Sequence, residues 1–234
     1  MDTSIGTANL LAIMCRYPVP GNGKSRLAET IGAVQAAMVS RALLLDLIAA
    51  HRGQPYGLMI VTPRQDSVHK KDFQDLFPGI HVHITTGAGL RGHKSGLWET
   101  FNTYLTRFRK VIALYSDTPM VGPSLVNDAF QKLDYFDVVI GPDTSDGYYL
   151  IGMKEANDLF SSLSPNRVPY RTKTIELINK LGLSYSMLDR RTDIDYVQDI
   201  AMIQWADVDC KWTRTIEVLV TLDLLCDDTL EFCG

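Results

Sequence analysis

The chain has 234 residues, of which 46% are hydrophobic and 21% charged, so it is long enough to bury the core of one domain. A net charge of −4 at pH 7 and the lack of any Lys or Arg run argue against a nucleic-acid-binding surface. The first residues do not resemble a signal peptide and no apolar run is expected to span a membrane, which predicts a cytoplasmic protein. The four cysteines have neither paired nor zinc-type spacing, so reduced structural thiols are expected.

Short apolar runs alternate with helical patterns along the chain. Strands are predicted over 9–16, 56–62, 80–85, 110–115, 136–141 and 183–189, with a further strand that begins at Tyr148. Helices are predicted over 32–51, 65–77, 95–109, 123–133 and 171–181. This alternation predicts an α/β fold with a mostly parallel sheet covered on both faces. Ligands in folds of this kind bind beyond the carboxyl ends of the strands.

The chain is expected to form one domain over residues 1–205 and a C-terminal extension over 206–234. Residues 213–225 are apolar at nearly every second or third position. They predict either a helix that covers the domain or a contact between subunits of a homo-oligomer, and the pattern leaves both alternatives open.

The first loop, PVPGNGKSRL at Pro18–Leu27, contains Gly-Lys-Ser after an apolar run. A phosphate-binding P-loop requires a glycine five positions before Gly23, where this chain has Pro18. Proline has no N–H to offer a phosphate, so the P-loop pattern fails.

The same loop nevertheless collects positive charge. Arg16 ends the first predicted strand, and Lys24 and Arg26 follow in a turn with Gly23 and Ser25. Three cations with glycines that allow close backbone approach predict a cradle for a diphosphate or triphosphate. The alternative is a solvated turn with ordinary surface charges.

Asp117 stands directly after the predicted strand 110–115. A carboxylate at the carboxyl end of a buried strand can hold a hard cation such as Mg²⁺ or Mn²⁺ at the ligand edge. The alternative is a cap for the helix that begins at Pro123.

A second acidic group comes late in the chain, at Asp193 and Asp195. The two carboxylates of D-x-D point the same way in an extended segment, so both can face one cation. Asp199 falls on the following predicted helix, where a solvent-facing role is expected.

Two residues are candidate general bases. Asp146 lies at a turn beside Gly147, ahead of the strand at Tyr148, with a turn-forming aspartate as its alternative. His93 lies in a glycine-flanked loop, although a surface histidine is the favoured interpretation there.

The ordered motifs RYPVPGNGKSRL, YSDTP, GPDTSDGYYLIGM and DIDYVQDI resemble a bacterial family of small GT-A-type transferases. That family belongs to the nucleotide-diphospho-sugar transferase superfamily, and its members are usually labelled glycosyltransferases. The GKSRL turn is also similar to that of phospholactate guanylyltransferase. The resemblance implies a Rossmann-like three-layer α/β/α sandwich with a mostly parallel mixed sheet over residues 1–205.

By this resemblance Asp117 matches the family's metal-binding aspartate. Lys24 and Arg26 match its basic nucleotide-loop residues, and Asp193 and Asp195 match a late acidic motif that provides a second arm on Mg²⁺ or Mn²⁺.

The chain departs from the family's pattern in two segments. Members commonly read D-G-G-Y-Y-L-I-G where this chain has Ser145 and Asp146 before Gly147, so the acid is displaced by one residue. The usual G-D-L-G-E-R becomes GLRGHK, with Leu90 and His93 among the exchanged positions. The resemblance implies that both departures fall where donor or acceptor groups bind.

The implied activity is a metal-dependent transfer from a nucleotide-activated donor to a small-molecule acceptor. Glycosyl transfer from a nucleoside-diphosphate sugar is the leading hypothesis. A nucleotidyltransferase that joins an NTP to a phosphorylated or phosphonate acceptor is the first alternative, and a non-catalytic binding protein of the same fold is the second.

Overall fold

The computed structural model describes residues 8–86, 92–160, 170–203 and 212–225, without the side chains of residues 92–95. The described residues form two compact units that interleave along the chain. Unit 1 takes the described parts of Met1–Cys15, Gln54–Tyr115 and Asn127–Arg191; unit 2 takes those of Arg16–Gly53, Ser116–Val126 and Thr192–Gly234. The boundary predicted at residue 205 remains a prediction.

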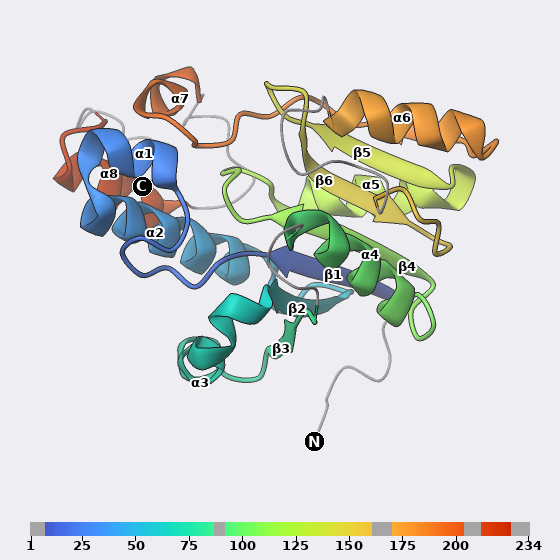
Figure 1. Cartoon of the computed structure of the whole chain (residues 1–234), viewed down its shortest axis with the longest axis horizontal. Helices are drawn as coiled ribbons and strands as arrows, with labels where there is room; N and C mark the ends of the chain where they lie inside the picture. Colours follow the sequence, from blue (N-terminus) through green and yellow to red (C-terminus); the bar gives the residue numbers. More distant parts are fainter. Residues whose placement is uncertain (1–7, 87–91, 161–169, 204–211, 226–234) are drawn as a thin grey trace. The chain divides into compact units, whose positions relative to one another are not determined.

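Unit 1 is built on a sheet whose seven described strands follow the order β3-β2-β1-β4-β6-β5-β7 (Figure 1). The strands are β1 (Asn9–Met14), β2 (Gly57–Thr62), β3 (His81–Ile84), β4 (Lys110–Tyr115), β5 (Val138–Pro142), β6 (Tyr148–Met153) and β7 (Tyr185–Met187). β6 pairs antiparallel with both β4 and β5, whereas the other four pairings are parallel. The predicted mostly parallel, mixed sheet is confirmed.

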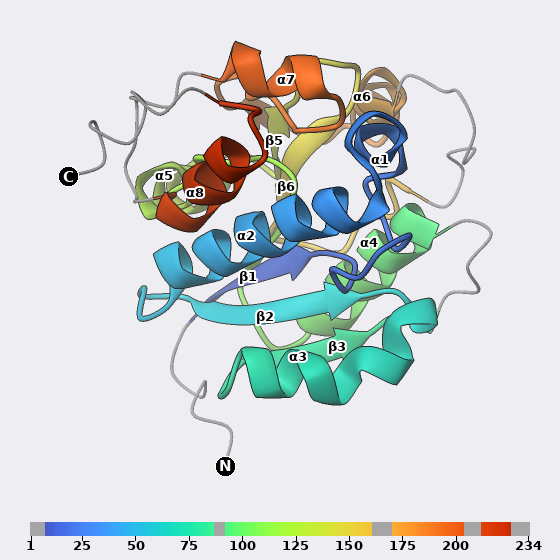
Figure 2. The ribbon, with the colours of Figure 1, turned by 90° about the vertical axis from the view of Figure 1, so that its left-hand side faces the viewer.

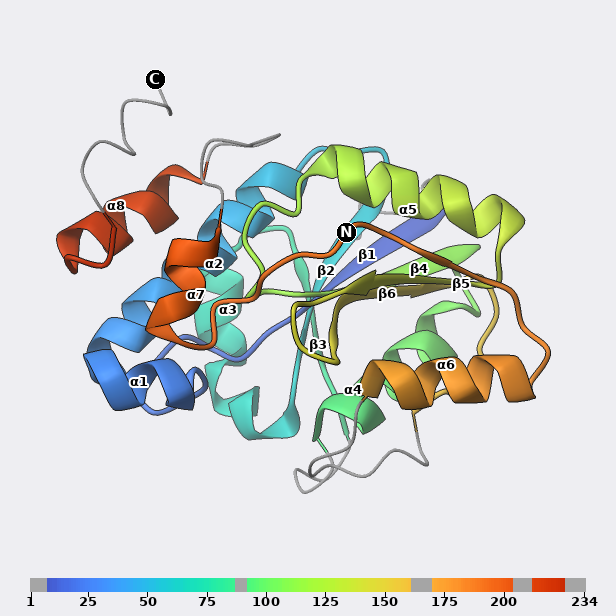
Figure 3. The ribbon, with the colours of Figure 1, turned by 90° about the horizontal axis from the view of Figure 1, so that it is seen from above.

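Helices cover both faces of this sheet within unit 1. Figure 3 shows α4 (Gly92–Tyr104) and α6 (Tyr170–Lys180) on one face and α5 (Pro123–Tyr135) on the other. Phe101 of α4 and Ile178 of α6 pack in one apolar cluster with alternate strand residues such as Leu10 and Ala12. On the opposite face Lys110 Nζ of β4 donates to Phe130 O of α5 at 2.7 Å. Strands buried on both faces are the physical reason for the nearly continuous apolar runs in the sequence.

The chain between β2 and β3 forms a short helical segment of unit 1. A 3₁₀ helix, η1 (Arg64–His69), runs into α3 (Lys70–Leu76), and Phe73 of α3 is fully buried.

Unit 2 consists of helices and of the connecting segments that carry the charged motifs. Its helices are α1 (Ser25–Ile31), α2 (Ala33–His51), α7 (Val197–Met202) and α8 (Thr213–Thr221). α8 lies alongside α2, as Figure 2 shows. The buried Asp46 of α2 accepts hydrogen bonds from Thr215 N and Thr215 Oγ1, both at 2.8 Å, and from Arg214 Nη1 at 3.1 Å. This carboxylate therefore ties the predicted C-terminal extension to α2.

The expectation about membrane-length segments needs a correction. α2 is long and apolar enough, by length and composition alone, to cross a membrane. Within unit 2, however, it buries Leu43, Leu47 and the polar Asp46 and His51. The core helix of a compact body passes the same test of length and apolarity.

The predicted elements agree with the structure within a few residues, with one omission. The sequence pattern treats residues 18–27 as a turn throughout, but the structure begins α1 at Ser25. α1 has only seven residues and its N-cap is Lys24, which makes no side-chain capping hydrogen bond, so the usual sequence signals for a helix start are missing.

Candidate metal and nucleotide site

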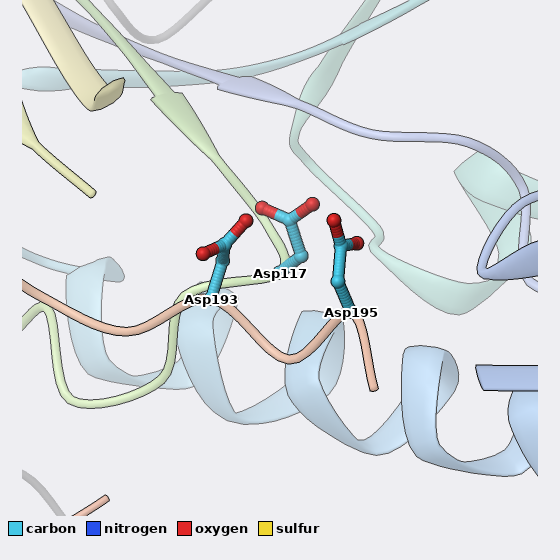
Figure 4. A group of neighbouring side chains, drawn as sticks. All are labelled: Asp117, Asp193 and Asp195. Carbon is cyan, nitrogen blue, oxygen red and sulfur yellow. The ribbon is translucent and has the colours of Figure 1, made fainter. Parts of the chain in front are cut away.

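Three aspartates of unit 2 converge on one point. One carboxylate oxygen from each of Asp117, Asp193 and Asp195 lies within 4.8 Å of the other two, and each residue is partly buried. Figure 4 shows the three carboxylates pointing in the same direction. Carboxylate oxygens are the ligands that Mg²⁺ and Mn²⁺ prefer, and their number and closeness fit one such ion. We refer to these three residues as the acidic triad.

Backbone hydrogen bonds connect the segments that carry the triad. Ile194, fully buried between Asp193 and Asp195, donates its N–H to Asp117 O at 3.0 Å. Asp199 of α7 accepts from Asp195 N at 2.8 Å and from Tyr196 N at 2.6 Å. Asp199, for which a solvent-facing role is expected, is partly exposed, and its carboxylate also satisfies the N–H groups of the two residues that precede α7.

Lys24 lies against the triad rather than in open solvent. Its Nζ donates to Ile194 O at 2.5 Å and lies 3.5 Å from Asp117 Oδ2 and 3.9 Å from Asp195 Oδ1. The side chain is 8% exposed. Its backbone has φ +50° and ψ +37°, a left-handed conformation that is unfavourable for a residue with a Cβ. The folded chain therefore keeps an unfavourable backbone conformation at Lys24, the residue whose ammonium contacts the acidic triad.

Arg26 is the second cation at the triad. Its Nη1 lies 2.5 Å from Asp195 Oδ2, and its guanidinium lies 5.6 Å from the ring centroid of Tyr196. The nearby Asp195 carboxylate raises the pKa of Arg26 above its ordinary value. The Arg26 side chain is 58% exposed, so solvent screens this pair far more than it screens Lys24.

Arg16 takes part in the structure of the first loop. Its Nη2 donates to Asn22 Oδ1, and Asn22 Nδ2 donates to Tyr17 O at 2.8 Å. Gly23 has φ +104°, a conformation that residues with side chains rarely adopt. The structure thus brings Arg16, Gly23, Lys24, Ser25 and Arg26 into unit 2 together with the acidic triad.

Asp146 belongs to unit 1, where it caps a helix. Its carboxylate accepts from Thr172 Oγ1 at 3.0 Å and Thr172 N at 3.3 Å in the first turn of α6, and lies 3.4 Å from Arg171 Nη2. Its role as a base therefore stays a prediction. The contacts with Thr172 and Arg171 agree with the alternative, in which Asp146 has a structural role in the turn.

The turn that carries Asp146 is ordered by a neighbouring acid. Asp143 Oδ1 accepts from Ser145 Oγ at 2.7 Å and from Gly147 N at 2.9 Å. A Cβ on Gly147 would lie 2.1 Å from Asp143 Oδ2, so any larger residue there would force this carboxylate out of its place in the turn. Arg171 Nη1 completes the turn by donating to Asp143 O at 3.2 Å and Gly147 O at 3.1 Å.

Some sequence expectations lie outside the described residues. These are Leu90, the side chain of His93, Cys210, Cys226 and Cys233. The remaining cysteine, Cys15, is a buried free thiol, and burial raises its pKa, which makes it unreactive.

Several contributors could not be recognised from the sequence. Ile194 acts through its main chain, which accepts from Lys24 and donates to Asp117, and no side-chain motif signals this. Tyr196 had a weak signal, since an aromatic residue directly after D-x-D can meet a nearby cation. Arg171 and Asn22 act through contacts that a residue pattern does not encode.

Comparison with solved structures gives the fold class. A protein from Desulfovibrio desulfuricans G20, provisionally named a nucleotide-diphospho-sugar transferase, matches with a TM-score of 0.82 and 22% identity over 92% of this chain and 96% of its own. A 4-diphosphocytidyl-2C-methyl-D-erythritol synthase from Anaerococcus prevotii DSM 20548 matches at TM-score 0.54 and 11% identity, over 85% and 95% of the two chains. The inositol-1-phosphate CTP transferase from T. maritima matches at TM-score 0.54 and 11% identity, over 94% and 98%. The chain therefore has the GT-A-like α/β fold of these proteins, which confirms the predicted fold class.

The family is shown by a match over residues 49–166, just over half of the chain's 234 residues. The chain belongs to the DUF2064 family, described as uncharacterised proteins conserved in bacteria. The matched region contains Asp117 and Asp146, whereas Lys24, Arg26, Asp193 and Asp195 lie outside it. No curated protein matches the chain.

Proposed function

We propose that this protein is a metal-dependent transferase that uses a nucleotide-activated donor, with glycosyl transfer from a nucleoside-diphosphate sugar to a small acceptor as the leading reaction. The observation that carries the proposal is the convergence of Asp117, Asp193 and Asp195 beside the basic groups of Lys24 and Arg26. Three carboxylates and two cations on neighbouring segments suit a ligand that combines a metal ion with phosphates. The fold shared with a protein named as a nucleotide-diphospho-sugar transferase supports the same class of donor.

The acidic triad would hold Mg²⁺ or Mn²⁺. When bound, the ion supplies positive charge to the phosphate oxygens of the donor. Lys24 and Arg26 add to this charge as the phosphates depart, and the glycine at position 23 lets the backbone approach them. We expect the reaction to take place in the cytoplasm.

In the leading reaction the acceptor oxygen forms a bond to the anomeric carbon of the sugar while the bond from that carbon to the diphosphate breaks. The nucleoside diphosphate leaves with the electron pair, and the acceptor's proton passes to a base, for which Asp146 is the candidate. The chain's own contribution is to supply the cations of Lys24 and Arg26 to the departing diphosphate.

Nucleotidyl transfer is the second candidate, because Arg16, Lys24 and Arg26 provide three basic groups in one loop, enough for a triphosphate. Two of the solved structures with the same fold are named as a 4-diphosphocytidyl-2C-methyl-D-erythritol synthase and an inositol-1-phosphate CTP transferase, and these names support the alternative. In that reaction an acceptor phosphate or phosphonate oxygen attacks the α-phosphorus and pyrophosphate leaves.

Binding order tests the proposal. Calorimetric titration of the four common NTPs, the matching NDPs and several NDP-sugars, each with Mg²⁺ or Mn²⁺, should give the tightest binding for one NDP and its NDP-sugar. A clear preference for one NTP, with pyrophosphate release in the presence of a phosphorylated or phosphonate acceptor, would replace glycosyl by nucleotidyl transfer. Failure of every nucleotide to bind would reject both reactions and favour a non-catalytic binding protein.

A matched variant tests the metal centre within this screen. Asp117→Asn keeps the shape of the side chain but removes the charge that a hard cation requires. Losing a ligand should weaken metal-dependent nucleotide binding by about 100-fold or more, since loss of a residue that merely supports a ligand already costs about 10–100-fold. Unchanged affinity in Asp117→Asn would reject the triad as the metal centre.

A further inference from the structure

Lys24 occupies a position that a resident metal ion would contest. Its ammonium lies 3.5 Å from Asp117 and 3.9 Å from Asp195, two of the three residues of the acidic triad. Its hydrogen bond to Ile194 O, at 2.5 Å, anchors it to the segment that carries Asp193 and Asp195. With 8% of the side chain exposed, the charge is largely removed from water and depends on these partners.

Electrostatic repulsion among the acids explains why the ammonium lies there. Three carboxylates within 4.8 Å of one another repel, and a buried cation lowers the free energy of that arrangement. A divalent cation held by the same carboxylates would meet the ammonium as a like charge. The ion and the ammonium are therefore competitors for the same acids.

We propose that Lys24 is a specificity-determining residue that closes the acidic triad to free divalent ions and opens it to a metal–nucleotide complex. The phosphates of that complex offer the ammonium a new anionic partner, so Lys24 can leave the carboxylates as the metal takes them. Metal and nucleotide then favour each other's binding, and by linkage each raises the affinity of the other by the same factor. This inference rests on the proposed nucleotide-using function.

Arg26 cannot fill the same role. Its ion pair is with Asp195, and its side chain is 58% exposed, so its charge is already stabilised by water. The left-handed backbone of Lys24, φ +50°, also distinguishes it, because such strain is kept where a side chain must reach a particular partner.

The test measures Mn²⁺ binding to the full chain by the paramagnetic resonance signal of the unbound ion. Lys24→Met keeps the apolar stem and removes the ammonium, and it should bind Mn²⁺ alone about tenfold more tightly than the wild type. In the presence of ADP, CDP, GDP or UDP, whichever binds the wild type best, the same variant should bind the nucleotide about tenfold more weakly. Tighter binding of Mn²⁺ alone together with weaker binding of the nucleotide, both in Lys24→Met, would show that the ammonium moves from the carboxylates to the phosphates.

Two further variants serve as controls. Lys24→Gln retains a donor for Ile194 O without the charge, and it should also tighten Mn²⁺ binding, so the test holds if Lys24→Met does not fold. Lys110→Met removes an ammonium that likewise contacts a carbonyl, Phe130 O at 2.7 Å, and a carboxylate, Asp134 Oδ1 at 2.6 Å, but in unit 1. Mn²⁺ affinity in Lys110→Met should equal that of the wild type.

The outcomes separate this inference from the proposed function. If Lys24 variants bind Mn²⁺ alone no better than the wild type while nucleotides still bind with metal, the inference is wrong and the function stands. If no nucleotide binds the wild type, the proposed function is wrong and the coupling to nucleotide is lost with it. Tighter Mn²⁺ binding by the Lys24 variants would then support only the competition between Lys24 and the ion.

Discussion

The main-chain nitrogen of Ile194 donates a hydrogen bond to the main-chain oxygen of Asp117 at 3.0 Å. This bond joins the segment after β4 to the segment before α7 and helps to hold Asp193 and Asp195 close to Asp117. The acidic triad depends on the relative position of these two segments, and neither belongs to a regular strand or helix there. Removing the donor should therefore disturb the triad without changing any of its carboxylates.

Ile194→Pro removes this N–H, whereas Ile194→Val keeps it and deletes one buried methylene at a cost of about 0.5–1.5 kcal/mol. We expect Ile194→Pro to weaken Mn²⁺-dependent nucleotide binding by at least about tenfold, in line with the loss of a group that supports a metal ligand. Ile194→Val should bind normally. Calorimetry at a temperature where both variants are folded makes the comparison, and equal affinities in the two would contradict it.

Asp46 provides a stability prediction for the C-terminal extension. Asp46→Ala removes the acceptor of both Thr215 groups and of Arg214 and leaves the buried Thr215 donors without it, at an expected cost of about 2–3 kcal/mol in the free energy of unfolding. Arg214→Ala is the matched control, because Arg214 is 53% exposed and its ion pair should contribute less than about 1 kcal/mol. Urea denaturation of both variants gives these values, and equal losses would show that the ion pair, not the buried acceptor, holds α8.

The same contact tests the predicted boundary at residue 205. A chain truncated after residue 205 keeps Asp46 but loses its Thr215 and Arg214 donors from α8, so it should be at least as unstable as Asp46→Ala. Stability equal to that of the full chain would instead identify residues 206–234 as an independent extension.

His51 predicts a pH dependence of stability. The fully buried imidazole shares a hydrogen bond of 2.8 Å between Nε2 and Val121 O. Burial lowers the pKa of His51 from 6.5 to about 4. Between these two values the unfolded chain binds a proton that the folded chain excludes, so stability falls as the pH drops from 6.5 to 4 and is unaffected by His51 above 6.5. The full loss is about 3 kcal/mol, from 1.36 kcal/mol per pKa unit.

A variant without the titrating group isolates this contribution. His51→Gln retains an N–H donor of similar reach and does not titrate. Urea denaturation from pH 7.5 to 4 should show a steeper decline for the wild type than for His51→Gln. Parallel curves would mean that His51 accepts a proton in the folded protein without penalty.

The strands and most of the acidic site can be predicted from the sequence, and the physical reasons can be named. Buried parallel strands require continuous apolar runs, so β1, β2 and β4 stand out in the pattern. Asp193 and Asp195 alternate in a D-x-D, which places both carboxylates on one side of an extended segment. Asp117 directly follows a buried strand, where binding residues of this fold collect.

The missing parts depend on tertiary contacts. An apolar run has the same composition whichever way its strand runs, so the antiparallel direction of β6 cannot be deduced from Tyr148–Met153. The contact between Lys24 and Ile194 joins residues 170 positions apart, and a residue pattern contains no information on such a pair. The sequence predicts that Lys24 meets phosphate, whereas in the structure its charge is satisfied by the acids that the metal would bind.

Asp146 remains to be tested as a general base, because its carboxylate already caps α6 through Thr172. Asp146→Asn separates the two roles: asparagine caps a helix about as well as aspartate, but its amide cannot take a proton from an acceptor hydroxyl. A base at this position predicts that Asp146→Asn lowers turnover of the donor found by the binding screen by about 10²–10⁴-fold with little change in melting temperature. Thr172→Val, which removes only the hydroxyl donor, should cost about 1 kcal/mol of stability and leave the pH profile of turnover unchanged. If Asp146→Asn keeps wild-type turnover at every pH, Asp146 is a helix cap and the base must be sought elsewhere.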